Sequence, residues 1–209
     1  MKKPANCLLV FLFSFLFYTN FSFAQITFKA NGDADSLGNN CYTVTTDNLT
    51  RAGSIWSFSQ IDLTNSFDFS AKLYFGTKKV QHGTGAIVAG CGADGIVFVL
   101  QQVSTTVGGA GFGIGYQGIS PSLGVEFDTY MNGWDPTYDH IAILKNGDVT
   151  HTNTATNLVG PIQAAVASNI KDSLDHWARF VWDVSTHTLD VYFDCVLKAS
   201  YTDDIVNTI

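Results

Sequence analysis

Alternating apolar and polar residues are the main pattern along this chain. Residues 67–75 place apolar side chains at every second position, and residues 177–182 also have the composition of a half-buried strand. Residues 96–100 form a continuous apolar run, which is typical of a strand buried on both faces. Residues 184–189 are expected to join strands at 179–183 and 189–193 as a hairpin. The pattern therefore predicts antiparallel sheets.

Helical periodicity is nearly absent. Residues 162–170 could form a short helix, or equally a strand followed by a loop. The other apolar segments are short and are separated by clusters of Gly, Asn, Asp and Ser, with no repeat, low-complexity tract or internal linker. These features predict an all-β fold, an antiparallel β-sandwich in a single domain.

The N-terminus has the composition of a secretory signal. Lys2 and Lys3 precede an apolar stretch at residues 8–17, and Ser22-Phe23-Ala24 precedes Gln25 as a cleavage site. The apolar stretch is shorter than the roughly 20 residues that a bilayer span needs. We therefore expect a signal peptide at residues 1–24, a mature domain at residues 25–209 without a membrane span, and a secreted or cell-surface location.

The charge of the mature chain argues against nucleic acid as a partner. Of 11 Lys and Arg residues, removal of Lys2 and Lys3 leaves 9 against 18 Asp and Glu, a net charge of −9. The largest basic cluster is Lys78-Lys79, too small to bind a phosphate backbone. Glycines are concentrated at residues 83–124, but none precedes a lysine as a phosphate-binding loop requires. Tight turns or close backbone approach to a ligand remain as alternatives for this segment.

Three cysteines remain in the mature chain, Cys41, Cys91 and Cys195. An exported chain permits a disulfide, and three thiols allow three alternative pairs with one thiol left over. The odd cysteine, and the lack of a closing apolar strand in residues 203–209, lead us to expect that the sandwich lacks its last C-terminal strand.

Residues 126–140 hold the densest group of candidate ligands. Glu126 and Asp128 are two positions apart after an apolar segment, so both carboxylates should leave the same face of a strand. Asp135 and Asp139 follow closely. Four carboxylates held together would raise one another's pKa and oppose folding, so we expect a bound cation to compensate them.

The ligand types suggest two ions. Asp128, Asn132, Asp135 and a backbone carbonyl offer the hard oxygens that suit Ca²⁺. A mixed set of oxygens and one imidazole suits Mn²⁺ or another first-row divalent ion, and its members would be Glu126, Asp128, Asp135 and His140. Ordinary structural roles are assigned to Trp134, as a sheet aromatic, and to His82, His151, His176 and His187.

This segment is similar to the metal-binding strand and loop of the L-type (legume-like) lectins, which is Glu-x-Asp-Thr-aromatic-x-Asn followed by Asp-Pro and His-Ile. Residues 92–100 and 111–116 resemble two further motifs of that family in the same order. Weaker similarity covers residues 41–46, 54–75 and 177–194. The resemblance is nearest to the secreted bacterial branch, and it implies a concanavalin-like jelly roll of two large sheets.

The resemblance also implies a sugar site. Asp94 would accept hydrogen bonds from two sugar hydroxyls, with a cis peptide bond between Ala93 and Asp94 held by a Ca²⁺-bound water. Asn132 would bind Ca²⁺ through its side-chain oxygen and donate its amide to the sugar. Tyr130 would give a backbone carbonyl to Ca²⁺ and place its ring against the sugar.

A backbone N–H from the turn at Gly111 and Phe112 would complete the sugar site. Phe112 departs from the family pattern, because many relatives have a second glycine there. In the family the metals fix loops and perform no chemistry.

We therefore expect a secreted, metal-dependent carbohydrate-binding protein that takes Ca²⁺ and Mn²⁺, binds a glycan and is not an enzyme. One alternative is a glycoside hydrolase on the same jelly roll, but Tyr130 and Met131 occupy the positions where glucanases carry the second glutamate that retaining hydrolysis needs. Another alternative is an adhesion or structural module that binds no glycan. The sequence leaves the sugar and the oligomeric state open.

Overall fold

The structure is a computed structural model that describes residues 26–78, 92–103, 105, 108–167 and 169–209. The predicted signal at residues 1–24, His82, Cys91 and the start of the glycine-rich segment lie outside these ranges. Within them the regular elements are strands and two short 3₁₀ turns, η1 (Gly111–Gly113) and η2 (Ile205–Asn207). No helix in this part of the chain has the length and apolarity to cross a membrane.

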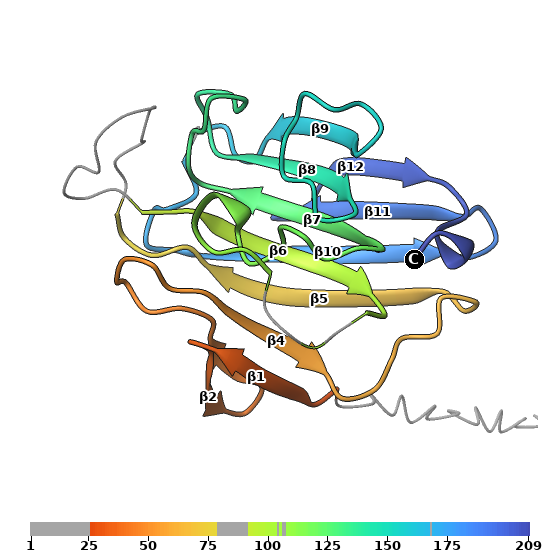
Figure 1. The fold of residues 1–209 in the computed structure, drawn as a ribbon, viewed down its shortest axis with the longest axis horizontal. Coiled ribbons are helices and arrows are strands. Elements are labelled where there is room, and N and C mark those ends of the chain that lie inside the picture. Colours follow the sequence, from red (N-terminus) through yellow and green to blue (C-terminus); the bar gives the residue numbers. More distant parts are fainter. Residues whose placement is uncertain (1–25, 79–91, 104, 106–107, 168) are drawn as a thin grey trace, which may run out of the picture.

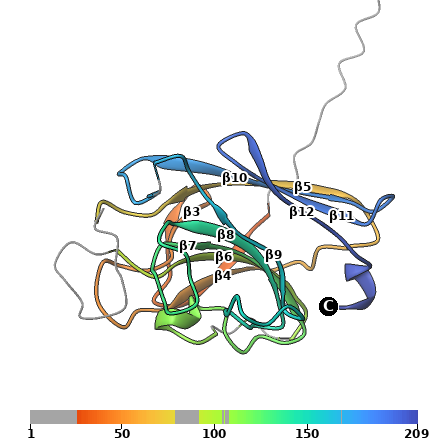
Figure 2. The ribbon, with the colours of Figure 1, turned by 90° about the horizontal axis from the view of Figure 1, so that it is seen from above.

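Two four-stranded antiparallel sheets form the layers of the sandwich (Figures 1 and 2). The site-bearing sheet has the order β6-β7-β8-β9, formed by β6 (Gly95–Gln101), β7 (Ser122–Asp128), β8 (His140–Lys145) and β9 (Asn157–Gln163). The opposite sheet has the order β12-β11-β10-β5, formed by β5 (Phe67–Tyr74), β10 (Asp175–Asp183), β11 (Thr188–Phe193) and β12 (Val196–Thr202). Two further ribbons are β1 (Phe28–Gly32) with β4 (Gly53–Ser57), and β2 (Asp35–Gly38) with β3 (Cys41–Thr43).

The strands expected from alternation are confirmed. The predicted strands at 67–75 and 177–182 become β5 and β10, which pair with Phe69 opposite Phe180. The predicted hairpin joins β10 to β11, with Asp183 opposite Thr188. Residues 162–163 form the end of β9, and residues 164–167 and 169–170 form no helix, so in the described residues the strand-and-loop alternative is right and the helix is not. The expected antiparallel β-sandwich is therefore observed.

The expectation of two buried faces at residues 96–100 is wrong for that strand. In β6 only Leu100 is buried, and the other residues are partly exposed, because β6 ends the order of its sheet. All seven residues of β7 are buried instead, since β7 lies between β6 and β8 and both of its faces are covered.

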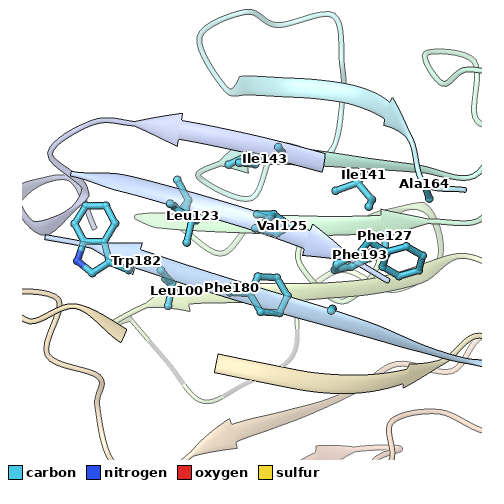
Figure 3. Packing of buried hydrophobic residues seen from close by; sticks show 14 of the residues in the cluster. Leu100, Leu123, Val125, Phe127, Ile141, Ile143, Ala164, Phe180, Trp182 and Phe193 are labelled. Carbon is cyan, nitrogen blue, oxygen red and sulfur yellow. The ribbon is translucent and has the colours of Figure 1, made fainter. Parts of the chain in front are cut away.

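The main core lies between the two sheets (Figure 3). From β7 it receives Leu123, Val125 and Phe127, and from β10 it receives Phe180, whose ring stacks on Phe98 at a centroid distance of 3.9 Å. Side chains alternate along a strand, so the side chains of Glu126 and Asp128 must leave the other face of β7, where Gly124 also lies. The core thereby fixes the direction of the two carboxylates.

A smaller apolar cluster covers that other face. Its buried members are Tyr116, Ala142, Leu144 and Val149, so the loop segments 108–121 and 146–156 both fold back over the site-bearing sheet. Gly124 makes room for this, because a Cβ there would lie 2.7 Å from Cζ of Tyr116. The Tyr116 and Ser122 hydroxyls are hydrogen-bonded at 2.9 Å. Loops rather than a second sheet therefore enclose this face.

Two of the three cysteines are described. Cys41 and Cys195 are exposed and free, so of the three alternative pairs the one between these two cysteines is not formed.

Candidate metal centre

Three chain segments meet at the end of β7. Asp128 is paired with Gly95 of β6 on one side and with His140 of β8 on the other. This register places Asp94, which directly precedes β6, and His140 on either side of the Asp128 carboxylate. The order of the strands therefore assembles residues that are far apart in the sequence.

The loop between β7 and β8 folds back on its own side chains. The Tyr130 N–H donates to Oδ1 of Asp128 at 2.6 Å, and the Asn132 N–H donates to Oδ2 of Asp135 at 2.7 Å. The Asp135 N–H in turn donates to the Asn132 carbonyl at 3.2 Å. Each of the two aspartates thus uses one oxygen to shape the loop and keeps the other for a ligand.

The structure brings together the four residues predicted to bind the first-row ion. His140 Nε2 lies 3.4 Å from Oε1 of Glu126 and 3.9 Å from Oδ1 of Asp135. Asp128, Asp135 and His140 each offer one ligand atom, all within 4.8 Å of one another. The Glu126 and Asp135 side chains are fully buried. The predicted spacing is therefore realised as one compact cluster.

The cluster fits a divalent cation because several of its carboxylate oxygens are buried without a hydrogen-bond partner. Both carboxylate oxygens of Glu126 and Oδ1 of Asp135 are buried without a hydrogen-bond partner among the described residues. Buried polar atoms are normally paired, and an unpaired carboxylate is more costly than a neutral group. A cation between these oxygens and the imidazole would satisfy all of them at once.

The electrostatics of the cluster agree with this fit. Burial raises the pKa of the Asp128 carboxyl well above its usual value, and the charges of Glu126 and Asp135 raise it further. Because metal ligands must be deprotonated, ion binding at this cluster competes with protons.

His151 also belongs to the cluster, although the sequence analysis gave it an ordinary structural role. Its Nε2 lies 3.0 Å from Oε1 of Glu126, 3.2 Å from Oδ1 of Asp135 and 2.9 Å from Nε2 of His140. Burial lowers the pKa of His151, but the carboxylates of Asp135 and Glu126 outweigh this effect and raise the pKa to about 10. His151 comes from the folded-back loop at 146–156, a contact for which the sequence has no local signal.

The other described histidines keep the structural roles expected of them. His176 is buried in the opposite sheet between Asp194 and Asp172, with its Nδ1 2.7 Å from Oδ2 of Asp194. His187 is exposed in the hairpin, where its ring stacks near Trp182.

Asp139 is not part of the cluster, which corrects the expectation of four carboxylates around a cation. Its side chain is fully buried against Lys171, whose Nζ lies 3.0 Å from Oδ1 of Asp139. Lys171 Nζ also donates to the Thr129 carbonyl at 2.6 Å, and the Ile170 N–H donates to Oδ2 of Asp139 at 2.8 Å. The charge of Asp139 is therefore compensated by an ammonium group.

Of the residues predicted for Ca²⁺, Asp128 and Asp135 lie in the cluster, and Asn132 lies in the same turn as Asp135. Tyr130 lies two residues beyond the end of β7, and its N–H donates to Asp128. Their roles as Ca²⁺ ligands remain a prediction.

The residues predicted for the sugar site lie at the same end of the sheet. The Ala93–Asp94 peptide bond is cis, as the resemblance implied, and the Asp94 carbonyl accepts the Thr129 N–H at 2.8 Å. Burial raises the pKa of the Asp94 carboxyl. Asp94 is thus attached to the loop that begins immediately after the metal-binding strand.

The turn at Gly111 and Phe112 reaches this end of the molecule through an aromatic contact. Gly111 has φ of 63° at the start of η1, and Phe112 is 48% exposed. The Phe112 ring packs edge-to-face on Trp134 at a centroid distance of 6.1 Å. Trp134 lies in the loop between β7 and β8, so its predicted role as a sheet aromatic is wrong.

Comparison with known proteins gives the same picture. A "Lectin-related protein" from Cladrastis kentukea is 43% identical over 150 residues, which is 54% of this chain and 51% of that protein. A "Bark lectin" from Styphnolobium japonicum is 40% identical over 78 residues, or 34% of this chain and 28% of the relative. The chain therefore spans about half the length of the first relative and less of the second.

Solved structures share the fold. The basic winged bean lectin, solved with Tn-antigen, superposes with a TM-score of 0.62 at 20% identity over 87% of this chain and 77% of that one. The family model of the legume lectin beta-barrel domain matches residues 19–209. The family match covers most of the chain, and the chain belongs to the L-type lectin family.

Proposed function

We propose that this protein is a secreted carbohydrate-binding protein whose sugar site is organised by Ca²⁺ and a first-row divalent ion. The observation that carries the proposal is the attachment of Asp94 to the metal-binding loop. Its backbone carbonyl accepts the N–H of Thr129, the residue that directly follows Asp128. Whatever fixes the strand end and its loop therefore also fixes the carboxylate that would hold the sugar.

The side chains of the cluster would bind the two ions as follows. Glu126, Asp128, Asp135 and His140 would hold the first-row ion, and Asp128, Asn132 and Asp135 would hold Ca²⁺. The ions supply positive charge that compensates buried carboxylates and fixes loop conformation.

The sugar would contact the rim of the cluster. The Asp94 carboxylate would accept hydrogen bonds from sugar hydroxyls, and the Asn132 amide would donate one. The rings of Phe112 and Trp134 pack against each other, Trp134 comes from the same loop as Asn132, and the faces of such rings suit the apolar faces of sugars. Relatives and structural neighbours named as lectins support a glycan as the ligand.

Binding is favoured over glycoside hydrolysis by burial. Retaining hydrolysis needs two carboxyl groups that flank the scissile bond about 5 to 5.5 Å apart. Glu126 is the carboxylate that would correspond to a catalytic residue, but its side chain is fully buried beneath the loops. A glycosidic bond in solvent could not reach it.

The test is a glycan array with the folded chain in Ca²⁺ and Mn²⁺, repeated after EDTA. We expect metal-dependent binding to a defined glycan class. The variant Asp94→Asn keeps the size of the side chain and should abolish this binding without changing the melting temperature. Asp175→Asn, on the opposite sheet and half exposed, is the matched control and should bind as the wild type does.

Two results would count against the proposal. Unchanged affinity of Asp94→Asn would place the sugar site elsewhere. Absence of binding by folded wild-type protein in either condition would favour the structural-module alternative.

A further inference from the structure

We propose that His151 is a direct ligand of the first-row ion, so that this centre has two imidazoles and selects Zn²⁺ over Mn²⁺. The inference rests on the metal centre of the proposed function. It goes beyond that function by assigning a residue from outside the 126–140 segment and by changing the expected ion.

The atoms around His151 Nε2 lie nearly as close together as the ligands of one ion. A tetrahedral site with bonds of 2.0–2.2 Å has edges of about 3.3–3.6 Å between ligand atoms. The observed separations from His151 Nε2 to Glu126, Asp135 and His140 are 3.0, 3.2 and 2.9 Å, and those from His140 Nε2 to the same two carboxylates are 3.4 and 3.9 Å. The separation of 3.4 Å lies within the expected range, the three from His151 are shorter, and that of 3.9 Å is longer, so a small shift of the His151 ring would give ligand spacing.

A direct hydrogen bond between the two histidines explains less. An N–H of one ring donating to the other would satisfy only the two facing nitrogens. Both oxygens of Glu126 and Oδ1 of Asp135 would stay buried without a partner. A cation at the point where these atoms converge satisfies the two nitrogens and the carboxylates together.

The His140 ring is held in a position suited to binding an ion through Nε2, and the His151 ring is buried with its Nε2 facing the same carboxylates. Nδ1 of His140 lies 3.4 Å from the Tyr138 carbonyl, an arrangement in which Nδ1–H donates and Nε2 keeps its lone pair for the ion. The His151 side chain is 4% exposed, and its backbone carbonyl accepts the Asn157 amide at 3.2 Å. Neither imidazole is a mobile surface group.

Hydrogen bonds to the Asp148 carboxylate fix the loop that carries His151. Oδ1 of Asp148 accepts the Thr150 N–H at 3.0 Å, and Oδ2 accepts the Thr156 hydroxyl at 2.7 Å. Asn153 also donates to Oδ2 of Asp148 at 3.1 Å. These bonds close the loop on one carboxylate, so His151 is delivered to the cluster by a defined structure.

A second imidazole changes which ion the centre prefers. Carboxylate and water ligands suit Mn²⁺, whereas imidazole suits Zn²⁺ and other later first-row ions, which also bind more tightly in general. The centre predicted from the sequence had one nitrogen. Adding His151 to this set shifts the donor atoms toward nitrogen and hence the preference toward Zn²⁺.

The first experiment counts imidazoles by X-ray absorption spectroscopy on the full chain loaded with Ca²⁺ and Zn²⁺. We expect scattering from two imidazoles in the wild type and from one in His151→Ser. A single imidazole in the wild type would overturn the assignment without need of any variant. His187→Ser, which removes an exposed histidine far from the centre in sequence, is the control and should keep two.

The second experiment is metal affinity by competition with a chelator. Loss of a partner that only orients a ligand costs about 10–100-fold, so loss of a true ligand in His151→Ser should weaken Zn²⁺ binding by more than about 100-fold. Mn²⁺ affinity should change by less than about tenfold. Equal losses for both ions would contradict the selectivity.

Glycan binding separates this inference from the proposed function. Two imidazoles on Zn²⁺ without glycan binding would uphold the metal centre and reject the lectin function. Metal-dependent glycan binding with only one imidazole on the ion would uphold the lectin function and reject His151 as a ligand.

Discussion

The buried ion pair between Asp139 and Lys171 should be strongly destabilising to break. Both side chains are fully buried, and the Lys171 ammonium is held by Asp139 and by the Thr129 carbonyl. The variant Asp139→Ala leaves that ammonium without its counter-charge and the Ile170 N–H without its acceptor. Removing one partner of a buried pair costs about 3–5 kcal/mol. For a domain of this size that corresponds to a fall in melting temperature of about 6–20 °C.

The double variant Asp139→Leu with Lys171→Met gives the sharper test. Replacing both partners by apolar residues is often nearly neutral. The Ile170 N–H would still lack an acceptor, which costs about 1–3 kcal/mol. The double variant should therefore be more stable than Asp139→Ala while remaining below the wild type, as measured by calorimetry with saturating metal.

A surface pair provides the control. Asp68 accepts two hydrogen bonds from Arg179 at 2.8 and 2.6 Å, but both side chains are about half exposed. Asp68→Leu should barely change the melting temperature, because solvent screens such pairs. A double variant at Asp139 and Lys171 no more stable than Asp139→Ala would refute the view that lysine compensates a buried charge here.

Three further predictions concern stability. At a free-ion concentration of 100 times Kd, metal binding contributes about 2.7 kcal/mol to stability. Removing the ion with a chelator should therefore lower the melting temperature by about 5–11 °C, and an unchanged melting temperature would refute a metal centre. Burial lowers the pKa of His176, but the hydrogen bond with Asp194 and the charges of Asp194 and Asp172 raise it above 6.5 overall. The stability lost in His176→Gln should therefore be greatest below pH 6.5 and shrink as pH rises through the raised pKa, as followed by urea unfolding from pH 5 to 9; a loss that grows with pH would contradict this. Gly124→Ala would place a Cβ 2.7 Å from the Tyr116 ring and should cost about 1–3 kcal/mol by urea unfolding, with an unchanged midpoint as the contrary result.

Periodicity and local spacing account for what the sequence could predict. Strand alternation depends only on neighbouring residues, so β5, β10 and the hairpin to β11 follow directly from their apolar positions. The same holds for Glu126 and Asp128, because two residues on one strand share a face in any fold. Asp135 and His140 were found because their loop is short.

The parts that could not be predicted depend on contacts between distant segments. His151 reaches the cluster only because the loop at 146–156 folds back over β8, and Lys171 reaches Asp139 across 32 positions of sequence. Strand pairing likewise decides whether an apolar strand lies in the middle of a sheet or at its edge. For this reason burial on both faces was predicted for β6, whereas the structure shows it for β7. The local sequence pattern gives no information about which distant segments come into contact.

Thr129 links three parts of the protein through a single residue. Its N–H holds the Asp94 carbonyl, its own carbonyl accepts the Lys171 ammonium, and it directly follows Asp128 on the metal-binding strand. On the proposed function, sugar and metal would share this connection, and a coupling free energy between two binding sites acts equally in both directions. A metal ion that improves glycan affinity must then be held more tightly by the glycan-bound protein, and saturating glycan should raise the EDTA concentration needed to strip the ion by that same factor.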